Sequence, residues 1–244
     1  MILHGLFGMG DNWASVSKKL SESGITCIVP DLRNHGRSPH ASGFSYDLIS
    51  QDILELTEAL SLNRISILGH SLGGKAAMFF TRSHPERVEQ LIVSDIAPRQ
   101  YARGHAEILH ALNSVDLSKP GSRKEVEKQL RKSVLDEATL QFLLKNLYWI
   151  SEDRLAWRFN LAVISENIDA VGQALPGGPV LNTPALFIRG GKSEYISARD
   201  EADIARWFSH STIRTIEHAG HWVHADQPDA FTALVIDFLK NNKT

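Results

Sequence analysis

The sequence predicts an α/β protein in which a mostly parallel sheet is flanked by helices. Short apolar runs rich in β-branched residues alternate with amphipathic stretches along most of the chain. This alternation is typical of a parallel sheet with helices on both faces. It is interrupted once, over residues 98–183, where only helical patterns occur. The interruption predicts a helical cap inserted between two strands.

Each predicted strand is short, and all but the last end at Gly, Pro or Asp. The strands are residues 25–30, 65–69, 90–95, 185–190 and 212–217, after a very short strand at the N-terminus. The predicted helices are 12–23, 45–61, 72–84, 197–209 and 228–241. We therefore expect a core built from 1–97 and 184–244, and a cap of 98–183 with helices and no strand. Right-handed crossovers bring the carboxyl ends of all strands to one edge, where ligand sites of open α/β sheets form.

Composition narrows the possible partners and compartments. The 244 residues carry a net charge of -2, and their Lys and Arg are scattered, so we expect neither nucleic acid nor a membrane surface as partner. No apolar run approaches the roughly 18 residues of a membrane helix. A single cysteine, Cys27, and no visible signal peptide predict a cytoplasmic protein without disulfides. The 11 histidines lack metal-ligand spacing, so we expect neither a metal nor another cofactor.

The strongest motif is "GHSLG" at 69–73, which lies between a predicted strand and a predicted helix. This G-x-S-x-G pattern in that context predicts a nucleophile elbow, a strained turn that exposes the side chain of Ser71. The following helix directs its N-terminal amides toward negative charge. Without the strand and the helix, the motif would be an ordinary Gly-rich turn. We expect His70 to shape the turn and not to act as the base.

A serine needs a base, and the segment "EHAGHWVHADQP" offers His218, His221 and His224. His221 follows a glycine in a loop just beyond the last predicted strand, which places it at the active edge. We choose His221 and expect surface or capping roles for the other two. The Gly-bounded "HGLFG" at 4–8 predicts an oxyanion hole from the backbone N–H groups of Leu6 and of Leu72, the residue after the nucleophile.

The motifs "HGLFG", "DLRNHGRS", "GHSLGGK", "SDIAP" and "AGHWVHADQPDAF" together resemble the α/β-hydrolase family, in particular its small bacterial esterase and acyl-CoA thioesterase branch (YbfF-like). The resemblance spans nearly the whole chain. It implies hydrolysis of esters or thioesters through Ser, Asp or Glu, and His, without a cofactor. We expect "DLRNHGRS" to be structural, with Asp31, Arg33 and His35 satisfying backbone groups.

The acid of the triad has two candidates. Many family members carry it four residues into a G-x-x-D loop, which here is Gly190 to Ser193, so Ser193 stands in the acid's place and Glu194 follows it. Asp95 ends the strand "QLIVSD" at the active edge, and the resembling branch uses this place for its acid. We favour Asp95, interpret Ser193 as a vacated position, and keep Glu194 as the alternative.

The predicted function is a serine hydrolase that cleaves carboxylic esters or acyl thioesters, with an ester or acyl-CoA as substrate. We expect Phe7, Trp157, Tyr195 and Trp222 to form an apolar substrate pocket. One alternative is a carbon–carbon bond hydrolase or lyase on the same scaffold, in which Ser71 and His221 act as base. Another is a receptor of this fold that binds a ligand without turnover.

The N-terminal strand is unusually short for this family. Either it is simply a short first strand, or the reading frame starts inside a longer gene. The resemblance implies two strands ahead of it, and we expect these two strands to be absent. The strand 25–30 would then be an apolar sheet edge, which favours pairing. We expect a homodimer contact there.

Overall fold

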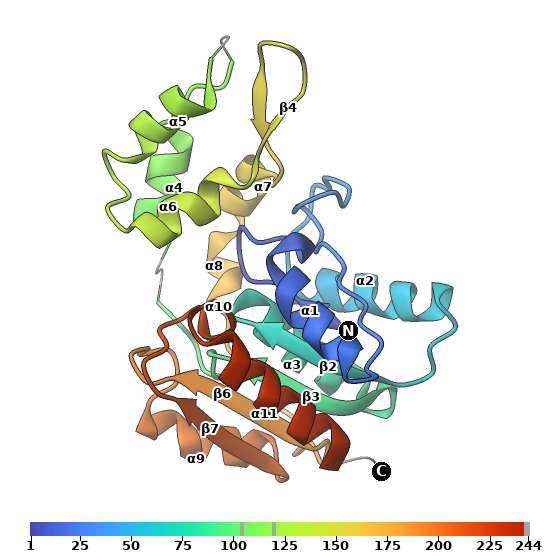
Figure 1. Ribbon diagram of the computed structural model, residues 1–244. Coiled ribbons are helices and arrows are strands. Elements are labelled where there is room, and N and C mark those ends of the chain that lie inside the picture. The colour runs from blue at the N-terminus through green and yellow to red at the C-terminus, as the bar shows by residue number, and fades with distance from the viewer. Residues whose placement is uncertain (103–104, 119–120, 242–244) are drawn as a thin grey trace.

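The computed structural model describes residues 1–102, 105–118 and 121–241 (Figure 1). Five parallel strands form the central sheet in the order β1-β2-β3-β6-β7. Their bounds are Ile2–Leu3 (β1), Ile65–His70 (β2), Val88–Ser94 (β3), Ala185–Gly190 (β6) and Ser211–Ile216 (β7). The predicted α/β class with a mostly parallel sheet is confirmed.

Helices cover both faces of the sheet (Figure 1). One face carries α1 (Ala14–Glu22) and α11 (Pro228–Asn241), and the other carries α2 (Tyr46–Ala59), α3 (Leu72–Ser83) and α9 (Ala198–Trp207). Shorter helices are η1 (Gly10–Trp13), η2 (Pro85–Arg87) and α10 (Val223–Asp226). Neighbouring residues of a strand enter opposite layers, as Ile67 packs with α2 and α3 and Leu68 with α1 and α11. Both faces are buried, which explains why the strands read as unbroken apolar runs.

Between β3 and β6 the chain forms a second layer beyond the sheet edge (Figure 1). Its helices are α4 (Ala106–Asn113), α5 (Arg123–Leu130), α6 (Glu137–Leu144), α7 (Leu161–Glu166) and α8 (Ile168–Val171). The expectation that this segment holds no strand was wrong. β4 (Leu147–Trp149) and β5 (Leu155–Trp157) pair in antiparallel orientation. Each has three residues, which is too short to show a periodic pattern.

Lys75 of α3 holds both connections between core and cap. Its Nζ donates hydrogen bonds to the carbonyls of Pro98 and Arg99, where the chain enters the cap, and of Gln173, where it returns. Leu175 N also donates a hydrogen bond to Pro98 O at 2.7 Å, so the two connections run side by side. Burial lowers the pKa of Lys75 to about 7, and the three carbonyl acceptors stabilise its charged form. The cap boundaries at 98 and 183 stay a prediction.

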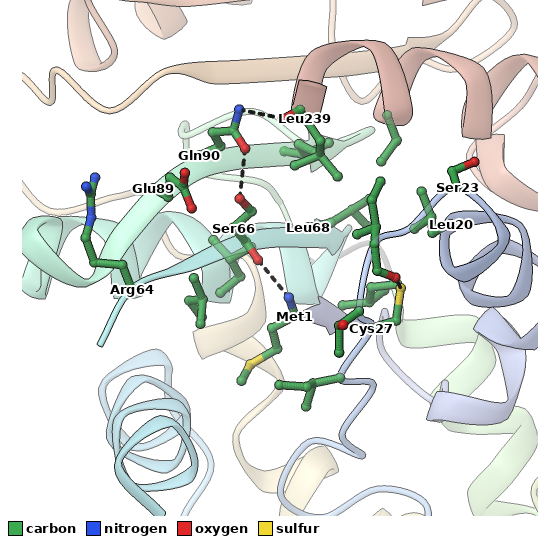
Figure 2. A pocket seen from close by; sticks show the side chains of 18 of the residues that line it. Met1, Leu20, Ser23, Cys27, Arg64, Ser66, Leu68, Glu89, Gln90 and Leu239 are labelled. Carbon is green, nitrogen blue, oxygen red and sulfur yellow. Dashed lines mark hydrogen bonds between the residues drawn. The ribbon is translucent and has the colours of Figure 1, made fainter. Parts of the chain in front are cut away.

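The prediction of a strand over 25–30 was wrong. This segment lies beside β1, and Ile2 N donates a hydrogen bond to Ile28 O at 2.8 Å. This contact does not extend into a strand ladder, and 25–30 has no strand assignment. β1 spans only two residues and therefore offers no ladder for a full strand. The segment borders a groove of about 350 Å³, in which the Met1 amine donates to Ser66 O at 2.7 Å (Figure 2). The homodimer contact through 25–30 stays a prediction.

Among the helices of the described residues, none is long and apolar enough to cross a bilayer.

Candidate active site

Ser71 occupies a strained turn between β2 and α3. Its backbone has φ 51° and ψ −116°, a region that non-glycine residues rarely adopt. A Cβ atom on Gly69 would lie 2.1 Å from the carbonyl oxygen of Gly73, so this close crossing of strand and helix requires glycine. The strand–turn–helix context predicted for "GHSLG" is therefore present, and Ser71 stands at the carboxyl edge of the sheet.

Asp95 and His221 form a hydrogen-bonded pair at the same edge. Asp95 directly follows β3, is fully buried, and accepts a hydrogen bond from His221 Nδ1 to its Oδ2 at 2.8 Å. Its Oδ1 accepts from Gly190 N at 3.1 Å. A buried carboxylate needs such donors to remain charged. Because the carboxylate accepts at Nδ1, the proton of the neutral imidazole lies there and Nε2 keeps its lone pair.

The loop after β6 contains the position at which an aspartate was expected. Ser193 is not merely a vacated place, because its hydroxyl donates a hydrogen bond to Asp95 Oδ2, the oxygen that also accepts from His221. Glu194 is exposed and makes no hydrogen bond or ion pair to any described residue. The geometry thus brings Asp95, and not Glu194, to the imidazole.

Two neighbours hold the His221 imidazole and its backbone. The ring of Tyr195 stacks on that of His221 with centroids 3.9 Å apart. His70 Nε2 lies 2.8 Å from the backbone carbonyl oxygen of His221. Burial, and then the neighbouring His221 and His224, keep the pKa of His70 well below its usual range. His70 is therefore neutral, and its Nε2–H donates to the His221 carbonyl.

The "HGLFG" loop and Ser71 line the same cavity. Phe7 N donates to His35 Nε2 at 3.1 Å, and Gly8 N donates to Gly5 O at 2.9 Å. Burial lowers the pKa of His35 to about 3, so its ring is neutral and can accept. Leu6 N donates to no atom of the described residues. Leu72 is the first residue of α3, whose N–H has no partner within the helix.

A cavity of about 300 Å³ opens onto these groups. Ser71 and His221 line it, together with three of the four predicted pocket residues, Phe7, Tyr195 and Trp222. Its apolar side chains include Leu6, Ile108, Phe142 and Leu143 from the loop and the cap. Its polar side chains include His4, His70, His105 and His224. An apolar lining with polar groups at defined places is typical of a small-molecule site.

The prediction for Trp157 was wrong, because this residue does not line the cavity. Its ring stacks on Phe159 at 5.3 Å, and Phe159 in turn packs on Phe7 at 4.9 Å. Phe159 therefore separates Trp157 from Phe7 in the cavity wall. An aromatic side chain in a cap is indistinguishable from a pocket residue in sequence, since both environments are apolar.

A second cavity of about 590 Å³ meets the first at Ser71, His105 and Tyr195. Its wall is more polar and includes Lys75 and Arg99, whose Nε is bonded to Asp200 Oδ1 at 2.7 Å. Within residues 1–102, 105–118 and 121–241, no group of three His, Cys, Asp or Glu side chains could hold a metal ion.

Several contacts of the site have no clear signal in the sequence. In the sequence, Ser193 indicates only that the expected carboxylate is missing, and nothing there points to a role for its hydroxyl. The bond from His70 to the His221 carbonyl joins positions 151 residues apart. For "DLRNHGRS", the expected structural role agrees with two contacts, as Asp31 accepts from Gly10 N and His35 from Phe7 N.

Comparisons with known proteins agree with this architecture. Residues 1–126 match the family described as alpha/beta hydrolase fold. Esterase YbfF of Escherichia coli (strain K12) is 34% identical over 99% of this chain and 92% of its own length. The sn-1-specific diacylglycerol lipase ABHD11 of Mus musculus is 36% identical over 98% of this chain and 80% of its own length.

A solved structure of a marine microorganism esterase superposes with a TM-score of 0.94 at 39% identity. The superposition covers 97% of this chain and 93% of the esterase chain. These relatives support a hydrolase that acts on esters. The family match over more than half of the chain, and relatives of this identity over nearly all of it, show that the protein belongs to the α/β-hydrolase fold family.

Proposed function

We propose that this protein is a serine hydrolase that cleaves carboxylic esters or acyl thioesters through an acyl-enzyme intermediate. In this proposal Ser71 is the nucleophile, His221 the general base and Asp95 the acid. The observation that carries it is the 2.8 Å bond between His221 Nδ1 and the buried Asp95, in a loop that lines the same cavity as Ser71. The esterases and lipases among the relatives support the same chemistry.

The proposed reaction uses each of these groups in turn. His221 Nε2 accepts the Ser71 proton as the hydroxyl oxygen attacks the acyl carbonyl carbon. The amides of Leu6 and Leu72 donate to the oxyanion that forms. The protonated imidazole, stabilised by Asp95, then gives its proton to the leaving alcohol or thiol. Water repeats the sequence on the acyl-enzyme, with His221 again as base, and releases the acid.

The two cavities suggest how a substrate divides around Ser71. The apolar cavity lined by Phe142, Leu143 and Trp222 fits an acyl chain, which gains by leaving water. The more polar cavity beside Arg99 and Gln100 fits an alcohol or CoA leaving group. This division makes substrates with an apolar acyl group and a polar leaving group the first ones to test.

The decisive experiment combines labelling with turnover. A fluorophosphonate probe should label the folded wild-type protein and fail to label Ser71→Ala. A panel of p-nitrophenyl esters and acyl-CoAs of increasing chain length then compares oxygen with sulfur leaving groups. The proposal is wrong if the wild-type protein is neither labelled nor active, or if Ser71→Ala retains ester hydrolysis at the wild-type rate.

A further inference from the structure

We propose that Asn146 of the cap is a positioning residue for the oxyanion-binding amide of Leu6. This inference rests on the proposed function, because it assigns the Leu6 N–H to the oxyanion. Asn146 lies two residues after α6 and is 1% exposed. Its Nδ2 donates a hydrogen bond to the carbonyl oxygen of Phe7 at 2.8 Å.

Two rigid peptide groups connect this contact to Leu6. The carbonyl that Asn146 binds and the N–H of Gly8 belong to one peptide group, between Phe7 and Gly8. That N–H donates to Gly5 O at 2.9 Å. The Gly5 carbonyl and the N–H of Leu6 belong to a second peptide group. The order is therefore Asn146, Phe7–Gly8, Gly5–Leu6 and the oxyanion, and we call this series the amide chain.

Because each peptide group is planar, the hydrogen bonds of the amide chain fix the direction of the Leu6 N–H. The C=O and N–H of a trans peptide point in opposite directions. When the Gly5 carbonyl is held from one side, the Leu6 N–H must therefore point to the other. Leu6 and Ser71 line the same cavity. Successive hydrogen bonds along such a series also polarise one another, which strengthens the last donor.

The other end of the loop is held independently of the cap. His4 Nδ1 lies 2.8 Å from Gly5 O, and His4 Nε2 accepts from Leu32 N at 2.9 Å, so the ring proton is on Nδ1 and donates to Gly5 O. Burial lowers the pKa of His4 to about 4, which keeps this tautomer neutral. Gly5 O thus has two donors, one from the core and one that depends on Asn146.

Two observations indicate that Asn146 does more than support the cap. Asn146 Oδ1 is buried without a hydrogen-bond partner among the described residues, which is unfavourable for folding. A leucine of similar size would avoid that cost if packing were the only role. Phe7, whose carbonyl Asn146 binds, has a left-handed φ of 58°, which needs outside contacts to persist.

The test replaces the amide by a near-isosteric apolar side chain. In Asn146→Leu we expect kcat for a p-nitrophenyl ester to fall about 10-fold, part of the loss of a whole oxyanion donor, with KM nearly unchanged. The affinity for a trifluoromethyl ketone with the same acyl chain, which forms an oxyanion on Ser71, should fall by the same factor. The affinity for the matching methyl ketone should not change. The change removes the unpaired Oδ1 but also takes the donor from Phe7 O and Phe142 O, so we expect Tm to stay within about 4 °C of wild type.

Asn160→Leu is the matched control. Asn160 is also a cap asparagine, and its Nδ2 donates to Asn34 Oδ1 of the core at 3.1 Å. Its side chain makes no hydrogen bond to the "HGLFG" loop among the described residues. Its side chain also caps α7. We therefore expect Asn160→Leu to lower Tm and to leave kcat and trifluoromethyl ketone affinity at wild-type values.

The outcomes separate the inference from the function on which it rests. Wild-type kcat and inhibitor affinity in Asn146→Leu would overturn the role of Asn146 while the proposed function stands. A lower kcat together with a raised KM and a strongly lowered Tm would also overturn the role of Asn146, because these changes would indicate a purely structural role. If Asn146→Leu does not fold, Asn146→Ala removes the donor without adding a charge and carries the same expectations for kcat and inhibitor affinity. Activity that survives in Ser71→Ala would overturn both proposals.

Discussion

The hydroxyl of Ser193 and the Nδ1–H of His221 donate to the same oxygen of Asp95, Oδ2. The carboxylate is therefore fixed from the loop after β6, where many relatives are expected to carry the acid itself. The backbone N–H of Gly190 holds its other oxygen from the same loop. Asp95 and the Ser193 hydroxyl together take the place beside the imidazole that an aspartate at position 193 would occupy alone.

Removal of the Ser193 hydroxyl should therefore impair catalysis. A hydrogen bond to a charged group contributes about 1.5–3 kcal/mol, and we expect Ser193→Ala to lower kcat about 10-fold with little change in KM. Ser197→Ala is the matched control, since Ser197, at the end of the same loop, donates to Asp200 of α9 at 2.7 Å and not to Asp95. Equal kcat values for Ser193→Ala and wild type would show that Asp95 is held well enough without this bond.

The identity of the acid can be tested by two amide substitutions. Asp95→Asn reverses the hydrogen bond at Nδ1 and favours the wrong imidazole tautomer, so we expect kcat to fall by about 10⁴-fold. Glu194→Gln changes an exposed group and should stay within about twofold of wild type. Steady-state kinetics on one ester measures both. Near-full activity in Asp95→Asn with a large loss in Glu194→Gln would reverse the assignment.

His70 should act through the backbone of the catalytic histidine. His70→Leu removes the donor to the His221 carbonyl, and a misplaced base should lower kcat about 10-fold or more. His70→Gln keeps a donor of similar reach and should recover part of that loss. The pH dependence of kcat/KM should not shift between His70→Gln and wild type, because His70 is neutral at neutral pH. Full activity in His70→Leu would contradict this role.

Acid should destabilise the fold through its buried histidines. Burial lowers the pKa of His4 to about 4 and of His35 and His224 to about 3, from an ordinary 6.5. As pH falls below 6.5 the unfolded chain takes up protons that the folded chain does not, so the free energy of unfolding decreases. Each group contributes up to about 1.4 kcal/mol per pH unit in the window from 6.5 down to its folded pKa.

Urea denaturation between pH 7 and 4.5 measures this slope. His35→Gln should be less stable at pH 7, since the Phe7 amide loses its acceptor, and should show a slope smaller by about one proton. His110→Gln alters an exposed histidine of α4 and should leave the slope as it is. An unchanged slope in His35→Gln would mean that this imidazole is protonated in the folded protein.

The central sheet was predictable because its strands carry their own signal. In β2, Ile67 and Leu68 face opposite helical layers, and apolar residues on both sides are typical of a buried strand. The segment 25–30 has the same composition and is not a strand. Composition indicates what a segment can form, whereas a ladder also needs a partner of sufficient length, and β1 offers two residues.

Candidate site residues were predictable where the backbone alone places them. Ser71 and Asp95 directly follow strands, so topology sets their position whatever the side chains around them do. Ser193, His70 and Asn146 act through hydrogen bonds between distant segments, and such bonds depend on side-chain directions that the pattern of a sequence does not contain. The prediction for Trp157 was wrong for a related reason. Whether a cap aromatic lines the cavity or packs inside the cap depends on how deeply it is buried, which the sequence does not show.

Lys75 has a consequence for how such proteins diversify. One ammonium group recognises three backbone carbonyls at the two ends of the cap, and carbonyls are common to all residue types. The bonds to Lys75 therefore do not depend on the side chains of Pro98, Arg99 and Gln173. A different cap grafted between residues 99 and 173 would meet the same lysine, so we expect such chimaeras to keep the core unaltered and to take their substrate preference from the new cap.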